Sequence, residues 1–135
     1  MRYQRYSVST PTLTGLGEKK HLLSSKITIE TFIEDVVNHI VFENLNNIIL
    51  VGHSFAGSVI SGVADRLKDR IKKLIYFDAM ILIDGQKPFD ITPKETVEQR
   101  IELAKKFGNN ISIPAPSADV FLSLIHISEP TRRHL

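Results

Sequence analysis

The chain has 135 residues, 42% of them hydrophobic, and a formal net charge of +2, which together predict one globular domain with a moderate core. So small a charge, without a basic stripe, argues against nucleic acid or an anionic membrane as a partner, and the absence of cysteine excludes a disulfide framework and a cysteine-based metal site. No apolar run approaches the roughly 20 residues that cross a membrane, and the N-terminus lacks the apolar core of a signal peptide, so we expect a cytoplasmic protein.

The first segments predict a strand followed by a loop. Residues Tyr6–Thr10 alternate and are rich in β-forming types, which predicts a strand that Pro11 ends or places at a sheet edge. The loop Thr12–Glu18 has two glycines but lacks the full Gly-x-Gly-x-x-Gly pattern, and no helix is expected at once, so we do not expect it to bind phosphate. Lys19–Lys26 is polar and is expected to be solvated.

A helix is predicted to begin after Thr28, its N-cap. Apolar residues recur at three- and four-residue steps from Ile29 to Val41 and form a wide stripe. Asp35 and His39 lie four residues apart on the other face, where we expect them to pair weakly. This placement makes His39 a surface residue rather than a catalyst.

The stretch Asn46–Asp65 carries the most specific pattern in the chain. It begins with Ile48–Val51, which has the length and β-branched content of a buried strand, and continues through the small-residue turn Gly52–Gly57 into a segment with helical spacing. A strand, a sharp turn with Ser54 at its apex and a helix form the layout of a nucleophile elbow. The alternative is an ordinary strand-to-helix turn with a helix-capping serine.

The residue types around Ser54 suit a strained turn for a steric reason. Bulky side chains two residues before or after the serine would collide, and these positions hold Gly52 and Ala56. The usual pattern has glycine at both, so Ala56 is a departure, although Gly57 follows it. The helix would aim its first N–H groups and a positive charge of about one half at a developing oxyanion, with the N–H of Phe55 as the first donor.

A second apolar run, Leu74–Phe77, follows the helical segment and is predicted to be a parallel strand. Strand, helix and strand in this order predict a βαβ unit with a right-handed crossover. Asp78 stands at the carboxyl end of the second strand, where active-site residues of open α/β sheets gather.

A further helix is predicted with Thr92 as N-cap, Pro93 as its first residue and Glu95 completing a capping box. We expect it to run to Phe107 and to end at Gly108. Its apolar face is modest, so the segment 92–108 is expected to cover a site, as a lid, rather than to build the core.

The tail 122–135 has a different character. The eleven residues Leu122–Arg132 can be written back, with permitted codons, as the transposon adapter of shotgun DNA sequencing libraries. We therefore expect adapter read-through in residues 122–135 and exclude them from the fold, which leaves 1–121 as the domain. The alternative is a genuine short strand, Phe121–Ile127.

Three motifs together resemble the α/β-hydrolase superfamily, in particular small esterases related to plant hydroxynitrile lyases and methyl-ester esterases. They are Thr10–Glu18, Val51–Gly57 and Tyr76–Ala79, and the resemblance covers about Tyr6 to Asp90. It implies an α/β fold with a mostly parallel sheet, flanking helices and a Ser–His–acid triad, without a cofactor or a metal. Residues 1–121 would then be a fragment of one such domain, with the N-terminal strands and the C-terminal part missing.

The resemblance also implies roles for three residues. Ser54 matches the nucleophile, and the N–H of Phe55 matches one oxyanion donor. Asp78 is a candidate acid, because some members place the acid after this strand, and a structural or pocket-lining role is the alternative that we favour. The loop with the second oxyanion donor would precede Met1, and the histidine base and the usual acid would come late in the chain.

None of the five histidines suits the base. His21 and His39 precede the serine, and His53 is its neighbour in a tight turn. His126 and His134 lie in the expected read-through.

These matches predict a carboxylesterase acting on small-molecule esters. Two alternatives stay open: a lyase acting on a cyanohydrin or β-keto substrate, and a non-catalytic binding protein with the same fold. The 135-residue chain itself is expected to be inactive, because a serine hydroxyl without a base is a poor nucleophile at neutral pH. We also expect it to be marginally stable, because the strand implied between Tyr6–Thr10 and Ile48–Val51 is missing and would leave buried sheet edges unpaired.

Overall fold

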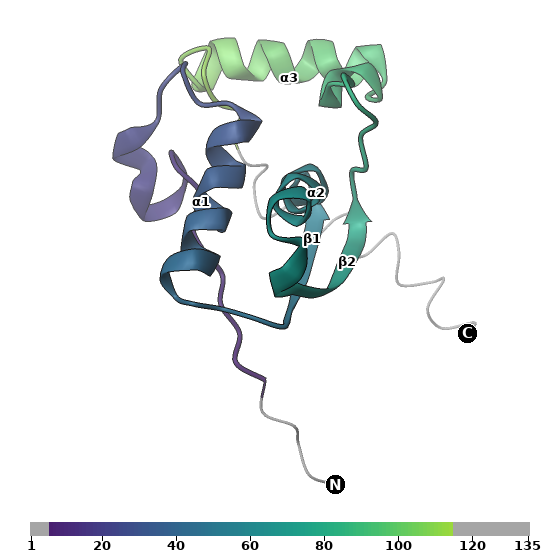
Figure 1. Cartoon of the computed structure of the whole chain (residues 1–135). Helices are drawn as coiled ribbons and strands as arrows, with labels where there is room; N and C mark the ends of the chain where they lie inside the picture. Colours follow the sequence, from purple (N-terminus) through teal and green to yellow (C-terminus); the bar gives the residue numbers. More distant parts are fainter. Residues whose placement is uncertain (1–5, 115–135) are drawn as a thin grey trace, which may run out of the picture. The chain divides into compact units, whose positions relative to one another are not determined.

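The computed structural model describes residues 6–114, and the chain divides into two units, Met1–Thr92 and Pro93–Leu135. The first unit alternates helices and strands in the order α1 (Ile29–Phe42), β1 (Ile48–Ser54), α2 (Ala56–Arg66) and β2 (Ile71–Ala79) (Figure 1). The second unit contains α3 (Lys94–Phe107). Three short 3₁₀ helices complete the described elements: Gly17–Leu22, Lys68–Arg70 and Pro88–Asp90. The α/β class predicted from the sequence is confirmed.

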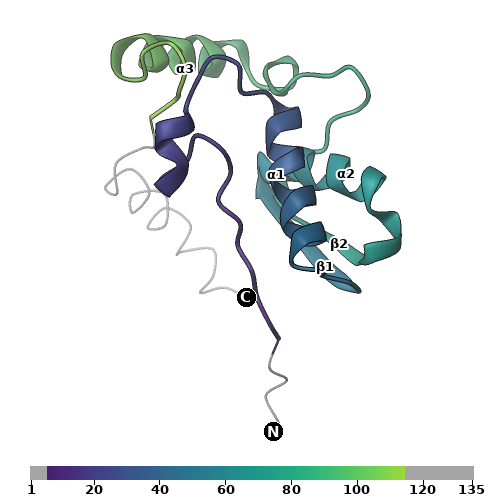
Figure 2. The same ribbon diagram turned by 60° about the vertical axis from the view of Figure 1, so that its left-hand side comes forward.

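The sheet of the described residues has two strands, β1 and β2, and they run parallel (Figure 2). The helix α2 connects them, so the predicted βαβ unit is present. Val51 lies opposite Ile75 and His53 lies opposite Phe77. Both strands are longer than the apolar runs that predicted them, because backbone pairing continues through polar residues at their ends.

The core lies between the two helices and one face of this sheet. Its buried residues come from α1 and α2 and are Ile33, Val36, Ile40, Val59 and Val63. Ile48 and Leu50 of β1 and Ile71 of β2 pack against them. We call this side of the sheet the inner face. Full burial of one such aliphatic side chain stabilises a fold by about 1.5–3 kcal/mol, so this cluster is the main source of stability of the unit.

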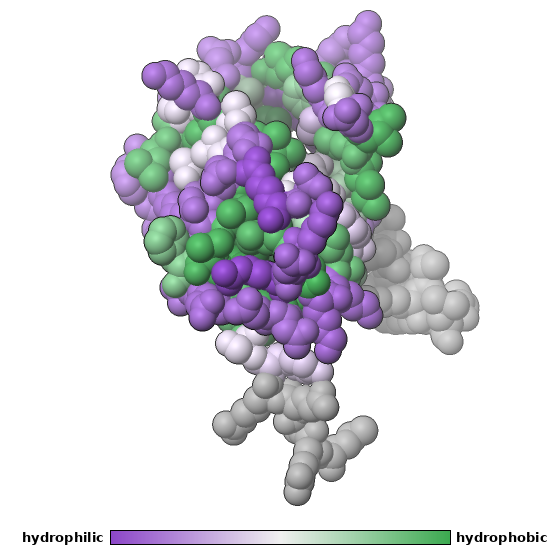
Figure 3. Space-filling model, viewed as in Figure 1, coloured by the Kyte–Doolittle hydropathy of each residue, from purple (hydrophilic) through white to green (hydrophobic). Residues whose placement is uncertain are grey.

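The opposite side of the sheet, which we call the outer face, carries Ile49, Val51, Ile75 and Phe77. Their exposed fractions are 48%, 56%, 38% and 65%. The prediction of fully buried strands is therefore wrong for this face. Side chains alternate between the faces of a strand, and within the described residues only the inner face is packed against the helices. Figure 3 shows apolar groups at the surface among hydrophilic side chains.

The predicted strand Tyr6–Thr10 is not a strand in the structure. A strand needs a neighbouring backbone to pair with, and the sheet of the described residues contains β1 and β2 alone. The N-terminal segment is instead attached to α1 by side chains. The hydroxyl of Ser9 contacts Nε2 of His39 at 2.5 Å.

Asp35 of α1 fixes the loop that follows this segment. The carboxylate of Asp35 accepts a hydrogen bond from the N–H of Thr14 at 2.6 Å and another from the hydroxyl of Thr14 at 2.9 Å. Lys19 Nζ lies 3.8 Å from Oδ1 of the same carboxylate. Asp35 and His39 thus bind the N-terminal segment, and the expectation that they pair with each other is wrong.

Within the loop, a hydrogen bond from the Thr12 side chain lowers the pKa of Glu18. A 3₁₀ helix occupies Gly17–Leu22, where the sequence predicted loop and solvated chain.

The two helices of the first unit are also joined by charge. The guanidinium of Arg66, at the end of α2, forms ion pairs with Glu30 and Glu34, which lie one turn apart on α1. The hydrogen bond to Glu30 is the main reason that the pKa of Arg66 is raised. These ion pairs join the end of α2 to α1 at the surface of the unit.

The second unit contains the helix expected at 92–108, with a different start. Pro93 is the N-cap of α3, and the hydroxyl of Thr92 donates instead to the carbonyl of Pro88 at 2.8 Å. The capping role predicted for Thr92 is therefore wrong. Gly108 ends the helix as predicted. A lid role for α3 stays a prediction.

The expected read-through at 122–135, with His126, lies outside the described residues. Among residues 6–114, no helix is long and apolar enough to cross a membrane.

Candidate active site

Ser54 lies where β1 ends and α2 is about to begin. It is the last residue of β1, and α2 starts two residues later at Ala56. Its φ is +54°, in the left-handed region that costs a residue with a side chain about 1–2 kcal/mol. Ser54 is exposed. Strained residues of this kind concentrate at functional sites, so the conformation marks Ser54 as a candidate.

Two glycines make the turn at Ser54 sterically possible. A Cβ on Gly52 would lie 2.8 Å from the carbonyl oxygen of Ala56. A Cβ on Gly57 would lie 2.3 Å from the carbonyl oxygen of Met80, just beyond β2. The need for a small residue before Ser54 is thus met at Gly52, as expected. After Ser54 the tight approach is at Gly57, which explains why alanine is tolerated at position 56.

The amino end of α2 faces the turn. Phe55 is its N-cap, with helical φ and ψ of −56° and −30°. The first N–H groups of a helix have no acceptor within the preceding turn, so they and the positive end of the helix dipole are available to an anion. The ring of Phe55 packs edge-on against Phe32 of α1 with a centroid distance of 5.9 Å. This packing anchors the residue whose N–H is the expected oxyanion donor.

Asp78 lies on β2 beside the end of β1. The register passes from His53 opposite Phe77 to Ser54 opposite Ala79, so Asp78 is an extra residue in β2. Its φ is +42°, again left-handed, and it is exposed. The structure therefore brings Ser54, Phe55 and Asp78 to one edge of the sheet, as the sequence predicted.

The histidines within residues 6–114 are engaged away from Ser54. The ring of His53 lies on the outer face, 5.5 Å from the ring of Phe77. His39 contacts Ser9, and Nδ1 of His21 lies 3.2 Å from the carbonyl oxygen of Glu18. The described residues thus bring no histidine into a hydrogen bond with Ser54. They also contain no group of three or more His, Cys, Asp or Glu side chains that could hold a metal ion.

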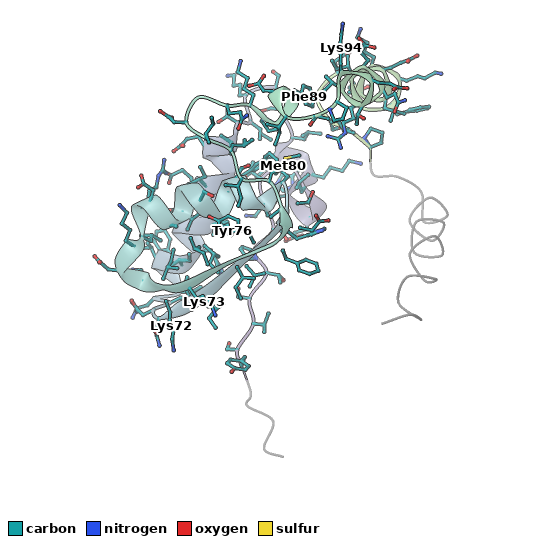
Figure 4. All side chains as sticks on the ribbon, turned by 90° about the vertical axis from the view of Figure 1, so that its right-hand side faces the viewer. Lys72, Lys73, Tyr76, Met80, Phe89 and Lys94 are labelled. Atoms are coloured by element: carbon teal, nitrogen blue, oxygen red, sulfur yellow. The ribbon has the colours of Figure 1, made fainter. Side chains whose placement is uncertain are left out.

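Sequence reasoning missed a polar contact behind the turn. The hydroxyls of Ser61 on α2 and Tyr76 on β2 are 2.9 Å apart, and Ser61 Oγ also donates to the carbonyl of Gly57 at 2.9 Å. Figure 4 shows Tyr76 between β2 and α2, toward the Met80 end of the strand and away from Lys72. A serine within a helix gives no signal of such a bond, because its partner lies fifteen residues further along the chain. Ser58, in the same helix, is 7% exposed, and its hydroxyl has no hydrogen-bond partner among the described residues.

Comparison with known proteins gives relatives that are named as esterases or methylesterases. No family model matches the chain. It is 44% identical over 94 residues to the carbendazim hydrolyzing esterase of Nocardioides sp. (strain SG-4G), a match that covers 70% of this chain and 39% of the esterase. It is 35% identical over 89 residues to putative methylesterase 14, chloroplastic, of Arabidopsis thaliana, covering 64% of this chain and 25% of that protein.

A solved structure is similar as well. It is an extracellular α/β-hydrolase from a Paenibacillus species, described as sharing structural and functional homology with tobacco salicylic acid binding protein 2. The TM-score is 0.68 at 39% identity, and the match covers 78% of this chain and 43% of the other. The chain thus spans less than half the length of each of these proteins. Since one relative is named chloroplastic and the solved structure is called extracellular, a cytoplasmic location stays a prediction.

Proposed function

Because this chain carries part of an α/β-hydrolase fold and is related to esterases and plant methylesterases, we propose that it is the nucleophile-bearing part of a serine esterase acting on small esters. The observation that carries the proposal is the left-handed Ser54 at the strand-to-helix turn, with φ of +54°. A capping serine in an ordinary turn needs no such strain. An exposed hydroxyl at the tip of a strained turn suits a nucleophile that must reach a substrate.

In this proposal the chemistry proceeds by acyl transfer through Ser54. A histidine takes the Ser54 proton while Oγ attacks the acyl carbon, and the oxyanion is stabilised by the N–H of Phe55 and the amino end of α2. The histidine then protonates the departing alkoxide, the ester C–O bond breaks, and water hydrolyses the acyl-serine to release the acid. The histidine and the triad acid would come from residues other than 6–114, and Asp78 would border the site.

Ester hydrolysis is preferred to the lyase reaction because the relatives above are named for esterase activity. Small methyl esters are the first substrates to test. The chain by itself is expected to show no turnover, because the described residues bring no histidine into a hydrogen bond with Ser54.

The test uses a chimera of the Nocardioides esterase in which the 94 matched residues of this chain replace the corresponding segment, so that the rest of that enzyme supplies its own residues. We expect the chimera to hydrolyse small esters and Ser54→Ala to lower kcat by at least about 1,000-fold, since removal of a serine nucleophile has effects of this size or larger. Ser24→Ala is the matched control and is expected to stay within about twofold.

Two outcomes would overturn the proposal. One is a folded chimera that hydrolyses no ester on the panel, and the other is a Ser54→Ala chimera that keeps its activity. The expected inactivity of the 135-residue chain alone is a separate prediction, and ester hydrolysis by that chain that disappears in Ser54→Ala would contradict it.

A further inference from the structure

Two residues of the described strands have a left-handed backbone, and they lie side by side. Ser54 ends β1 with φ of +54°, and Asp78 is near the end of β2 with φ of +42°. The other non-glycine residues with positive φ among residues 6–114 are all asparagines, outside the strands. Asparagine and aspartate tolerate this region better than other residues with a side chain. The strain at the edge of the sheet is therefore concentrated at one place.

The conformation of Asp78 changes what lies opposite Ser54. With His53 opposite Phe77, a regular parallel strand would place Asp78 opposite Ser54. The extra residue advances β2 by one position, so that Ala79 lies there instead. Bulges of this kind redirect a strand locally and are common beside active sites.

The redirected backbone places Met80 against both sides of the turn. Its N–H donates to the carbonyl of Ser54 at 2.8 Å. Its own carbonyl lies so close to Gly57 that a Cβ there would be 2.3 Å from the oxygen. Met80 thus binds the residue at the apex of the turn and packs on the first turn of α2.

The rest of the contact between α2 and β2 does not depend on the bulge. Ser61 and Tyr76 join the two elements through their hydroxyls, at a point before the bulge in β2 (Figure 4). Val59 and Val63 hold α2 on the core. A change at position 78 is therefore expected to affect the turn and leave the helix in place.

We propose that Asp78 is a positioning residue that acts through its backbone: its left-handed bulge places the Met80 N–H on the Ser54 carbonyl and so holds Ser54 in its left-handed conformation. The role rests on the proposed function of Ser54. It requires a residue that tolerates positive φ, and it does not require the negative charge of the carboxylate.

The test compares three variants of the 135-residue chain. Asp78→Asn and Asp78→Gly both accept a left-handed backbone without the charge, whereas Asp78→Val disfavours that backbone strongly because valine is β-branched. Amide hydrogen exchange by NMR measures the Met80 N–H, with the Val63 amide of α2 as an internal reference. The coupling constant between the amide and α protons of Ser54 reports its φ.

We expect Asn and Gly to keep the Met80 protection within about threefold and to leave the Ser54 coupling constant unchanged. Val is expected to lower Met80 protection by about tenfold or more, relative to Val63, and to shift the Ser54 coupling. The proposal is overturned if Val leaves both measurements as they are, or if Asn and Gly lose the Met80 bond as Val does, since the carboxylate would then be what matters.

If the valine variant unfolds as a whole, Asp78→Ala replaces it, because alanine also disfavours positive φ but is smaller. The proposal is then overturned if alanine leaves the Met80 protection and the Ser54 coupling unchanged, or if Asn and Gly lose the Met80 bond as alanine does. None of these measurements uses activity, so the two proposals can fail separately. If the chimera hydrolyses no ester while the Met80 N–H of the 135-residue chain stays protected, the nucleophile role of Ser54 is contradicted and the role of Asp78 is not.

Discussion

The two faces of the β1–β2 sheet are built from similar side chains and have different surroundings. Ile48 and Leu50 on the inner face pack on the buried core between α1 and α2, whereas Ile49 and Val51, their neighbours in the chain, are about half exposed. A continuous apolar run is typical of a parallel strand that is covered on both faces. The contrast teaches that composition alone does not fix burial. Alternation along the strand decides which face a side chain joins, and packing helices decide whether that face is buried.

The largest effect that would sharpen this contrast is expected from the core. Ile40→Ala, at a side chain with 2% exposure, should lower the free energy of unfolding by about 2–5 kcal/mol, because it removes buried methyl groups and leaves a cavity. Ile49→Ala on the outer face should change it by only about 0.5 kcal/mol. Urea unfolding followed by circular dichroism measures both. Equal losses would show that the outer face is packed in solution.

A smaller effect is expected where α2 approaches the end of β2. Gly57→Ala forces a Cβ against the Met80 carbonyl, and overpacking of this kind costs about 1–3 kcal/mol. The control is Gly85→Ala, where φ is +76° and no atom lies within 4 Å of the added Cβ, so that strain alone of about 1 kcal/mol is expected. Thermal unfolding of the two variants separates clash from strain. If Gly57→Ala were neutral, the close packing of Met80 on α2 would be wrong.

The smallest effect is expected from the hydrogen bond between the hydroxyls of Ser61 and Tyr76. Tyr76→Phe and Ser61→Ala each remove one partner of a part-buried hydrogen bond, which contributes about 0.5–1.5 kcal/mol. A double-mutant cycle in urea isolates the pair, since both single changes remove the same bond. Additive losses in the double variant would mean that the two hydroxyls do not interact.

Local patterns in the sequence predicted the turn and the helices well. The small residues around Ser54 and the apolar spacing of α1 are determined within a few residues of chain, and both elements lie where they were expected. Thr28 is the N-cap of α1, as predicted. The placement of Ser54, Phe55 and Asp78 at one edge of the sheet could be predicted because each lies at or just after the carboxyl end of a parallel strand.

The failures share a dependence on distant partners. Tyr6–Thr10 has the composition of a strand, but pairing requires a neighbour that composition does not reveal. Thr92 has the identity of a cap, but its hydroxyl binds Pro88 instead. The left-handed backbone of Asp78 coincides with the change of register between β2 and β1, and a single aspartate at the end of an apolar run gives no sign of it.

The left-handed backbone of Ser54 has a consequence for how the sequence can vary. Glycine adopts this conformation freely, so selection for a robust fold alone would favour glycine at the apex of the turn. Under the proposed function, serine there would sacrifice some robustness in exchange for reactivity, a compromise common in enzymes. If the proposal holds, this position indicates whether a related gene still encodes the reaction, and a glycine here would mark a copy that has kept the fold without the catalytic serine.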